Sequence, residues 1–541
     1  MSTNKETGSY YTPYELVEFM VKYLKKEQQD FSCVLEPSVG DGRFLSALLS
    51  VCEKIEAIEL FDEKVEDVRS RFQDEKLKVM KRDFLEYAMQ PKKKYSLIIG
   101  NPPYINPKVM SPKETDLAKQ LCEKEGLQKS IMQNMWLAFV VGAIQLLNEK
   151  GSIFFVLPME FLQVQYAEKL RIHLEKKFNT IHIISFTTKI FPEIEQEICL
   201  VYLTNKKKSV PYILYEVYQD ATSTIPSFSN TIQKNKPLKK WSNAVLLDED
   251  ILLLKYLSER YKKMGDMGES APGIVTGGNK YFILTDKQAT EYNCLDYTLP
   301  ILQKSSYIGE NTIIIDNSTI DDLREKKRPM CLLNLSKIKE DKMPEEIREY
   351  LNRIKDEKVG NVKLIERYKC ANRTPWYGVP IVNKGDVIFF KRYHLVPRVY
   401  INRADIHTTD AGYHVRLGEE WDKDSFVFCF YNSLTLAQCE FQGRYYGGGV
   451  SELTPSEFKE LPVPYCKIEK EDVAFLNQMF REKRETEEIV AFVNSRTLAD
   501  IEKDTIEKLE KIRKSLVKRR CQKRNQQGRR LKMKSRGYPF S

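Results

Sequence analysis

The chain has few of the residues that build metal sites or disulfide frameworks. Only five histidines occur in 541 residues, and none stands at metal-ligand spacing. The eleven cysteines are scattered, without a Cys-x-x-Cys pair or a Cys/His cluster. This usage argues against a structural zinc site and for reduced thiols in a cytoplasm. We therefore expect chemistry that needs no metal.

Long apolar runs are also missing. No window approaches the roughly 18–20 unbroken apolar residues of a membrane span, and the first fifteen residues lack the apolar stretch of a secretory signal. The composition, 42% hydrophobic and 30% charged, suits a globular protein. We expect two or three domains in a cytoplasmic protein that does not bind membranes.

Positive charge is concentrated at one end of the chain. The formal net charge is +10, yet residues 513–536 hold twelve Lys and Arg and no acidic residue. The rest of the chain is therefore near −2. Such a segment can bind a polyanion through counterion release, or it can be a solvated tail.

Residues 1–205 alternate between helical and strand-like patterns. The run "TPYELVEFMVKYL" predicts a helix with Thr12 as N-cap, Pro13 at the first position and Glu15 completing a capping box. Residues 131–151 predict one long helix, and short apolar runs predict strands. Strands separated by helices imply a parallel, doubly wound sheet with helices on both faces.

The alternation ends after about residue 205. Residues 270–465 are aromatic-rich with short irregular strands, and the chain is helical and charged from about 468. We predict three parts: a first domain over 1–245, a second over 246–467, and a helical, basic segment over 468–541.

Glycines follow the first predicted strand, in "VLEPSVGDGRFLSALL" (34–49). Gly40 and Gly42 predict a turn that lets the backbone approach a ligand at a helix N-terminus. The spacing is not the G-x-G-x-x-G of NAD enzymes, and Asp41 would repel a pyrophosphate. An adenosine with a cationic amino-acid arm fits better, although such a turn can also be an ordinary connector.

Acidic residues end the next two predicted strands. Glu59 closes "IEAIEL", where an acid can accept hydrogen bonds from both ribose hydroxyls. Asp83 follows the third strand, where a carboxylate can accept from an adenine amino group. A solvated Glu at a strand end is common, but features after three successive strands indicate a nucleoside site.

The fourth predicted strand stops at "GNPPYI" (100–105). Prolines have no N–H to continue a ladder, so this corner is rigid. An exocyclic amine on a base is a poor nucleophile because its lone pair is delocalised into the ring. The Asn101 side-chain oxygen and the Pro102 carbonyl can accept from its hydrogens and localise that pair, and Tyr104 can stack on the base.

These motifs, in this order, resemble the gamma class of DNA adenine-N6 methyltransferases of restriction–modification systems, TaqI-like in motif order. The resemblance is detailed over residues 8–205 and looser beyond. It implies a Rossmann-like class I domain that uses S-adenosyl-L-methionine, then a mixed α+β target-recognition domain and a helical basic C-terminus. The implied reaction is direct methyl transfer to N6 of a flipped-out adenine. Asn at position 101, where cytosine-N4 enzymes more often have Ser, favours adenine.

The resemblance also assigns site residues. "GSYYTPYELVEFMV" resembles the motif that closes over the methionine part of the cofactor, and Phe191 in "TTKIFPEIEQEICLVYL" is the candidate second aromatic wall opposite Tyr104. Phe191 could equally be a core residue. The implied catalytic residues are Asn101, Pro102, Pro103, Tyr104 and Phe191. The implied cofactor-binding residues are Tyr11, Thr12, Glu36, Pro37, Gly40, Gly42, Phe44, Glu59, Asp83, Phe84, Asn101 and Pro103.

The later part of the chain resembles a target-recognition domain, starting near 273–284 and ending near 444–464. Its cations suit phosphate positioning and guanine reading in the major groove of double-stranded DNA, although they can also be simply solvated. The candidate DNA-binding residues are Lys391, Arg392, Arg398, Arg403, Arg416 and Arg444.

Three other functions stay open. The Asn-Pro-Pro-Tyr signature also occurs in methyltransferases of RNA and of protein glutamine, and a non-catalytic DNA-binding specificity protein is a third option. The chain begins at the cofactor motif and contains no Pro-Asp dipeptide, so we expect no fused nuclease. A cognate restriction endonuclease would then be a separate chain. The segment after 468 could pack on the recognition domain, dimerise or hold flanking DNA.

Overall fold

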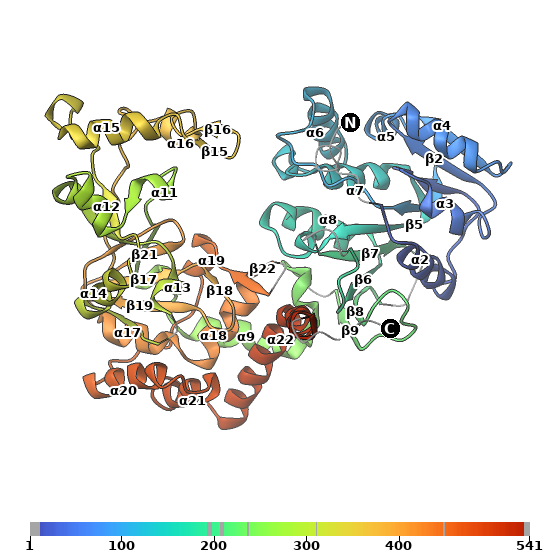
Figure 1. The fold of residues 1–541 in the computed structure, drawn as a ribbon. Coiled ribbons are helices and arrows are strands. Elements are labelled where there is room, and N and C mark those ends of the chain that lie inside the picture. The colour runs from blue at the N-terminus through green and yellow to red at the C-terminus, as the bar shows by residue number, and fades with distance from the viewer. Residues whose placement is uncertain are drawn as a thin grey trace. The chain divides into compact units, whose positions relative to one another are not determined.

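The computed structural model describes residues 11–191, 197–205, 210–234, 237–309, 311–446 and 449–534, with side chains as far as Arg520 (Figure 1). The chain divides into two compact units. Unit 1 contains Met1–Ile251 with Tyr446–Gly449 and Arg520–Ser541, and unit 2 contains Leu252–Tyr445 and Val450–Arg519. The three-part division predicted from the sequence stays a prediction.

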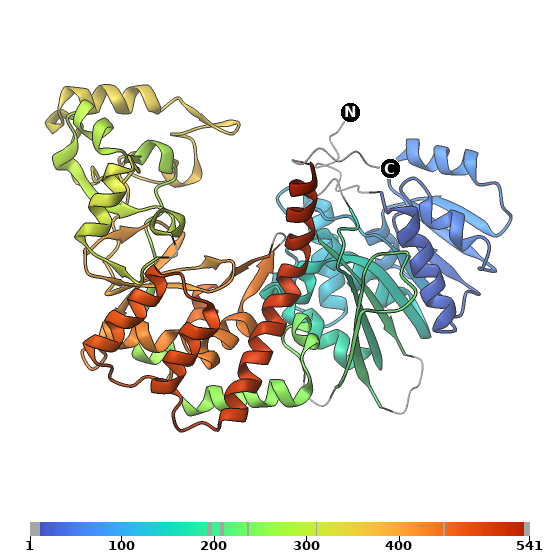
Figure 2. The same cartoon turned by 60° about the horizontal axis from the view of Figure 1, so that its bottom comes forward.

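Unit 1 is built on a nine-stranded sheet whose order is β3-β2-β1-β4-β5-β7-β6-β8-β9. Figure 2 shows its strands side by side. The strands are β1 (Val34–Glu36), β2 (Ile55–Glu59), β3 (Leu77–Lys81), β4 (Tyr95–Gly100), β5 (Leu147–Pro158), β6 (Thr180–Phe186), β7 (Ile198–Thr204), β8 (Tyr212–Tyr218) and β9 (Phe228–Gln233). The α-helices are α2 (Tyr14–Lys26), α3 (Arg43–Leu48), α4 (Asp62–Arg71), α5 (Phe84–Met89), α6 (Pro112–Lys124), α7 (Met135–Leu146) and α8 (Glu168–Lys177).

The first five strands are parallel, with helices between them, which confirms the expected doubly wound fold. Their central member β1 pairs with β2 on one side and with β4 on the other, Val34 lying opposite Ile55 and Leu97. Parallel strands end at the same edge of a sheet. The segments that follow β1, β2, β3 and β4 are therefore brought together, although they are far apart in the sequence.

The sheet is not parallel throughout, so that expectation is wrong at β7 and β9. Strand β7 lies between β5 and β6 and runs antiparallel to both, and β9 is antiparallel to β8. A parallel return needs a crossover of about a dozen residues or more, usually with a helix. No helix occurs among the described residues between Phe186 and Ile198, and the chain returns in the opposite direction.

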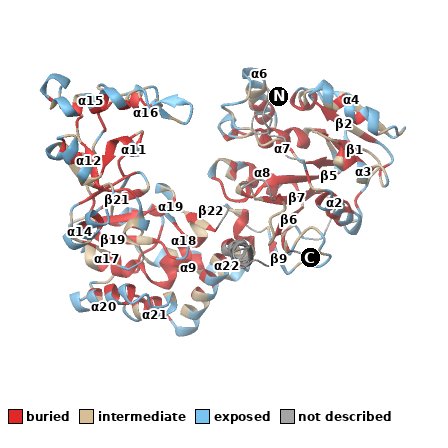
Figure 3. Cartoon of the chain, in the orientation of Figure 1, coloured by how far each residue is buried: buried red, intermediate tan, exposed pale blue. Residues whose placement is uncertain are grey.

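Both faces of the sheet are covered. Helices α2 and α3 pack together over a cluster that includes Leu16, Met20 and Leu45, while α5, α6 and α7 pack against one another. Strands β4, β6 and β7 are buried along their whole length, and β5 is buried from Gly151 onward. This buried interior is red in Figure 3. Continuous apolar strands are typical of a sheet that is buried on both faces.

Two predicted helix ends are wrong. Helix α2 begins at Tyr14 with Pro13 as N-cap and no side-chain cap, so Thr12 does not cap it. Helix α7 ends at Leu146, because Leu147 already pairs with Tyr95 of β4 and the chain continues as β5. The predicted helix over 131–151 therefore merges a helix with the start of a strand.

Unit 2 is a mixed α+β structure, as expected. It holds sheets of five, four, three and two strands, the largest with the order β10-β21-β17-β19-β13. The strands are β10 (Gly268–Pro272), β11 (Ile283–Leu284), β12 (Thr298–Leu302), β13 (Ile314–Ile315), β14 (Cys331–Leu333), β15 (Lys358–Val359), β16 (Val362–Lys363), β17 (Val387–Phe390), β18 (Arg392–Tyr393), β19 (Arg398–Asn402), β20 (His407–Thr408), β21 (Gly412–Leu417), β22 (Arg444–Tyr446) and β23 (Val450–Glu452). The helices after unit 1's α8 are α9 (Asp248–Arg260), α10 (Met264–Met267), α11 (Asn279–Phe282), α12 (Asp286–Glu291), α13 (Ser305–Ile308), α14 (Asn317–Glu325), α15 (Glu345–Ile354), α16 (Tyr368–Ala371), α17 (Lys423–Phe430), α18 (Ser433–Gln442), α19 (Pro455–Lys459), α20 (Lys470–Arg481), α21 (Thr486–Thr497) and α22 (Lys503–Lys534).

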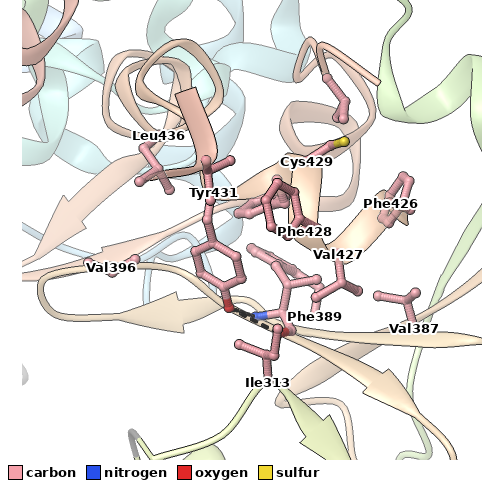
Figure 4. Close-up of a cluster of buried hydrophobic side chains, with 14 of the residues drawn as sticks. Ile313, Val387, Phe389, Val396, Phe426, Val427, Phe428, Cys429, Tyr431 and Leu436 are labelled. Atoms are coloured by element: carbon pink, nitrogen blue, oxygen red, sulfur yellow. Dashed lines mark hydrogen bonds between the residues drawn. The ribbon is translucent and has the colours of Figure 1, made fainter. Parts of the chain in front are cut away.

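The main core of unit 2 joins the five-stranded sheet to helices α17, α20 and α21. Tyr431 marks its centre in Figure 4. Its ring is buried, and its hydroxyl accepts from the Val399 N–H at 3.2 Å and donates to the Val399 carbonyl at 3.0 Å. A buried phenol needs such partners, and here they fix β19 to the loop after α17.

Candidate active site

A cavity of about 250 Å³ lies in unit 1 at the carboxyl ends of the parallel strands. Its walls come from the segments after β1, β2, β3 and β4, with Tyr11 and residues of α6 and α7. The predicted site residues that line it are Tyr11, Pro37, Gly40, Glu59, Asp83, Phe84, Asn101, Pro102, Pro103 and Tyr104. Motifs separated by up to ninety residues in the sequence therefore surround one space.

The glycine turn after β1 has the backbone that only glycine adopts easily. Gly40 and Gly42 have φ values of 59° and 79°. A Cβ on Gly42 would lie 2.7 Å from Cε2 of Phe72, so any other residue at position 42 would require the Phe72 ring to move. The Gly40 N–H donates to Oε2 of Glu59 at 3.0 Å, which links the turn after β1 to the end of β2.

Glu59 is buried and held by backbone donors. Its Oε1 accepts from the N–H groups of Leu60 and Phe61 at 2.9 and 3.1 Å, while Oε2 accepts from Gly40. Because each carboxylate oxygen can accept about two hydrogen bonds, Oε2 has capacity for one more. The carboxylate is thus fixed at the cavity wall, where it can accept from a ligand hydroxyl.

Asp83 has two roles available. Its side chain caps α5 by accepting from the Leu85 N–H at 2.7 Å, and it also lines the cavity. Burial raises the pKa of the Asp83 carboxyl, while the backbone hydrogen bonds lower it. The ring of Phe84, the next residue, stacks on Phe139 of α7 with centroids 4.6 Å apart. These two rings form an apolar wall suited to a purine.

Glu36, the last residue of β1, is 1% exposed and lies beneath the cavity wall. Among the described residues, its Oε2 has no hydrogen-bond partner. Burial raises the pKa of Glu36 well above its ordinary value, and the nearby Asp41 and Glu59 add to this. A buried acceptor beside two other acids is suited to a cationic group.

The Asn-Pro-Pro-Tyr corner follows β4 and meets the glycine turn directly. The Ser38 hydroxyl donates to the Asn101 carbonyl at 3.2 Å. The Asn101 amide donates through Nδ2 to Oγ1 of Thr12 at 3.1 Å. The corner therefore lies beside the glycine turn after β1. One hydrogen bond links it to that turn, and another links it to the segment before α2.

The two predicted aromatic walls differ in position. Tyr104 lines the cavity, and its hydroxyl donates to the Val156 carbonyl at 3.1 Å. Burial raises the pKa of Tyr104, so the phenol stays neutral. Phe191 is 7% exposed, does not line the cavity, and belongs to the core cluster against which Tyr104 packs.

Some predicted site residues do not line the cavity, and some residues that line it were not predicted. Thr12, Glu36, Gly42 and Phe44 do not line the cavity, and Phe44 is part of the core. Cavity residues that the sequence reading did not single out are Ser38, Ile58, Leu60, Phe61, Lys64, Arg82, Leu85, Ile105, Val109, Glu114, Met135 and Phe139. Those next to a motif could have been found by proximity, but Met135 and Phe139 come from α7 and carry no such signal.

Most candidate DNA-binding cations of unit 2 are already in ion pairs. The pairs are Arg392 with Glu452 (2.7 Å), Arg403 with Asp424, Arg416 with Glu269 (2.5 Å) and Arg444 with Glu457 (3.2 Å). Arg398 is half-buried with its guanidinium 5.9 Å from the centre of the Phe480 ring, and Lys391 is half-buried. Any contact with DNA by the paired arginines would have to compete with these carboxylates.

Within the described ranges, no three His, Cys, Asp or Glu side chains gather as metal ligands would. In the same part of the chain, no helix has the length and apolar content required to cross a bilayer.

Two family models match the chain. Residues 42–191 match the Eco57I restriction-modification methylase, and residues 238–498 match the C-terminal domain of the Type II methyltransferase M.Eco57I. The chain is 24% identical over 485 residues to the Type II methyltransferase M.AccI of Acinetobacter calcoaceticus, which covers 84% of this chain and 85% of that protein. It is 29% identical over 202 residues to the restriction enzyme and methyltransferase RM.Eco57I of Escherichia coli, of which it spans 19%.

A solved structure shows a similar fold. The Type IIL restriction-modification enzyme MmeI, determined in complex with DNA, matches with a TM-score of 0.56 at 12% identity, covering 99% of this chain and 80% of that one. Both family models are named after Eco57I methylases, and together they match most of the chain, in the order that its two units follow. The chain therefore belongs to the Eco57I family of restriction-modification methylases.

Proposed function

We propose that this protein transfers a methyl group from S-adenosyl-L-methionine to N6 of an adenine flipped out of double-stranded DNA. It acts as the modification enzyme of a restriction–modification system in a bacterial or archaeal cytoplasm, and protects DNA from a cognate endonuclease on a separate chain. One observation carries the proposal: the Asn101 corner and the Gly40 turn line a single cavity. Membership of a restriction-modification methylase family supports it.

The residues around the cavity fit the cofactor. Glu59 would accept from a ribose hydroxyl, Asp83 from the adenine amino group, and the Phe84 ring would lie against the base. Glu36 is suited to the ammonium of the methionine part, because its buried Oε2 lacks a partner in the described structure. When bound, S-adenosyl-L-methionine supplies a methyl carbon attached to a cationic sulfonium. The remaining residues proposed to surround it are Tyr11, Thr12, Pro37, Gly40, Gly42, Phe44, Asn101 and Pro103.

The Asn101 corner would prepare the nucleophile. Oδ1 of Asn101 and the carbonyl of Pro102 accept from the two hydrogens of the adenine amino group, which localises the nitrogen lone pair. Pro102 and Pro103 keep these acceptors rigid, so little reorganisation is required at the moment of attack. Most of the acceleration then comes from alignment, for which effective molarities reach about 10⁵–10⁸ M.

Stacking would offset the cost of base extrusion. Removing a base from the duplex costs on the order of a few kcal/mol, and stacking on an aromatic side chain returns about 1–3 kcal/mol per base. Tyr104 is suited to this role because its ring lines the cavity and its hydroxyl is fixed to Val156. Phe191 would contribute from behind, as a buried support for Tyr104.

Unit 2 is proposed as the target-recognition domain. Its arginines at positions 392, 403, 416 and 444 can exchange a carboxylate partner for a phosphate. Where the arginine is exposed, as for Arg392, Arg403 and Arg416, such an ion pair is worth only about 0–1 kcal/mol, so this exchange is energetically accessible. The pair of Arg444 and Glu457 is largely shielded from solvent, so its exchange costs more.

The decisive test is Asn101→Ala, assayed by transfer of labelled methyl to duplex DNA. We expect transfer to be abolished while cofactor binding, measured by calorimetry, weakens far less, since the change removes the acceptor for the amino group and the donor to Thr12 but leaves Glu59 and Asp83 in place. Asn230→Ala is the matched control: it removes two hydrogen bonds, to the Ala244 and Leu246 carbonyls at 2.8 Å, elsewhere in unit 1. Normal turnover by Asn101→Ala would overturn the proposal.

The acceptor is tested separately. Duplex DNA, RNA and protein compete for labelled methyl, and host DNA is sequenced for N6-methyladenine after expression of the chain. We expect methyl in adenine at one DNA sequence. Label in RNA or in protein glutamine would instead favour a methyltransferase of that class.

A further inference from the structure

We propose that Thr12 and Arg43 are positioning residues that hold the Asn101 amide in its reactive orientation and couple it to the cofactor turn. This inference rests on the proposed function. It assigns Thr12 a role besides contact with the cofactor, and it gives a role to Arg43, which neither the motifs nor the cavity lining single out.

The first link is between Thr12 and Asn101. Nδ2 of Asn101 donates to Oγ1 of Thr12 at 3.1 Å, and Thr12 is 4% exposed and stands behind the cavity wall. A hydroxyl can donate or accept, so by itself it would tolerate either orientation of the amide. An adenine amino group that donates to Oδ1 removes this ambiguity, because only the amide N–H₂ then faces Thr12. In that state the Thr12 hydroxyl accepts, and the bond polarises the amide so that Oδ1 becomes a better acceptor.

The second link is between Arg43 and the segment that contains Thr12. Nη1 of Arg43 donates to the Thr12 carbonyl at 3.1 Å, and Nε donates to Oδ2 of Asp41 at 2.7 Å. Its guanidinium also lies 5.4 Å from the Tyr11 ring centre and 5.0 Å from that of Tyr14. A planar guanidinium can make these contacts at once, whereas an ammonium cannot.

These contacts matter because the start of α2 has no cap of its own. Pro13 is the N-cap and supplies no side-chain hydrogen bond. The Thr12 segment is instead held by the side chains of Arg43 and Asn101, which donate to the Thr12 carbonyl and hydroxyl. Arg43 is the first residue of α3, directly after the positive-φ Gly42 of the cofactor turn. A chain of contacts therefore runs from Asp41 through Arg43 and Thr12 to Asn101. Ordering of the cofactor turn would be transmitted to the amide that activates the acceptor.

The test compares Thr12→Val with Thr12→Ser in single-turnover methylation of duplex DNA. Valine keeps the shape and loses the acceptor, so we expect the maximal rate to fall on the order of 10²-fold, as for small misplacements of reacting groups. The KM for DNA should stay within about twofold, the Kd for the cofactor should rise by a much smaller factor than the rate falls, and serine should restore most of the rate.

Thr204→Val is the matched control for loss of a buried hydroxyl. Thr204 is also 4% exposed, and its Oγ1 accepts from Ser152 at 2.9 Å, far from the cavity lining. It should leave the rate unchanged. A normal rate for Thr12→Val, or a loss that appears only as weaker cofactor binding, would overturn the positioning role; the second result would make Thr12 a cofactor ligand alone.

A double-mutant cycle tests Arg43. If Arg43 acts through Thr12, Arg43→Gln should lower the maximal rate of the wild-type protein, and it should lower the rate of the Thr12→Val variant by a smaller factor. Arg43→Lys should lower the maximal rate nearly as much as Arg43→Gln, since lysine lacks the planar guanidinium that makes these contacts together. Additive losses would overturn the link. Activity of Asn101→Ala would refute the proposed function itself, whereas normal Thr12→Val with inactive Asn101→Ala would refute only this inference.

Discussion

Glu36 shows how a single residue can be placed for a ligand at a cost to stability. Its carboxyl is fully enclosed at the end of β1, with Asp41 and Glu59 nearby, and its pKa is raised well above 4.5. Above that pH the folded state keeps a proton that the unfolded chain has released. Stability therefore falls as pH rises from about 4.5 towards the raised pKa.

Glu36→Gln should remove this dependence, because glutamine does not titrate. We expect the variant without cofactor to gain stability over the wild type as pH rises above about 4.5, with no gain at lower pH, and to bind S-adenosyl-L-methionine more weakly. Denaturant melts from pH 4 to 9 and calorimetry measure the two effects. Glu53→Gln, at an exposed position, is the control. A stability difference that is constant over this pH range would contradict the prediction.

Individual residues of the site were predictable where residue type limits the chemistry. Gly40 and Gly42 adopt the positive φ that glycine permits, Glu59 ends β2, and Asp83 follows β3, as expected. Thr12 was misassigned because a Thr-Pro pair before a helix is typical of a cap. Its hydroxyl instead meets Asn101, 89 positions later in the chain, and local pattern carries no information on such a contact.

Helix α5 combines a structural and a binding role at its first turn. Asp83 caps it through the Leu85 N–H and also faces the cavity. A cap is worth about 0.5–2 kcal/mol, and serine caps nearly as well as aspartate. The two roles can therefore be separated by side-chain choice.

Asp83→Ser should keep the stability of unit 1 while S-adenosyl-L-methionine binds more weakly, since serine can cap the helix but provides no carboxylate. Asp83→Ala should bind the cofactor as weakly and also lose about 1 kcal/mol of stability. Chemical denaturation and calorimetry give both quantities. Asp422→Ala, which removes the equivalent cap of α17, should leave cofactor affinity unchanged. If affinity falls in Asp83→Ala but not in Asp83→Ser, Asp83 acts only as a cap.

Element types were more predictable than element ends and directions. The strands from β1 to β8 lie at apolar runs of the sequence, although β5 begins at Leu147, inside the helix predicted over 131–151. The end of α7 and the antiparallel course of β7 were missed, because pairing partners decide both. Leu147 belongs to a strand instead of the helix because it pairs with Tyr95. Strand β7 lies between β5 and β6, although these two strands are consecutive in the sequence.

At the scale of the whole molecule, charge is distributed unevenly. Seven of the twelve basic residues of 513–536 follow Arg520. Before that point α22 is part of a packed structure, since Ile512 and Leu516 are buried and Arg513 pairs with Glu510. A deletion meant to remove only charge should therefore begin after Arg520.

Deletion of residues 521–541 should reduce the salt dependence of duplex DNA binding. If all seven cations contact phosphate, the slope of log K against log salt falls by about 6, at roughly 0.9 per contact. Fluorescence anisotropy over a sodium chloride series measures it. A full-length variant with these seven residues changed to glutamine separates charge from chain length. An unchanged slope in both variants would show that the tail does not hold DNA.

The sequence by itself determined the chemistry of this protein: which groups accept, which turns require glycine, and where a proline corner ends a strand. These properties are local, because they depend on residue type and immediate neighbours. Only the tertiary structure decided which groups share a space. It brought Asn101 to Thr12, placed Phe191 in the core outside the cavity lining, and left Oε2 of Glu36 without a hydrogen-bond partner among the described residues. Parallel pairing of β1 with β2 and β4 is the physical reason, because it brings distant segments to one edge of the sheet.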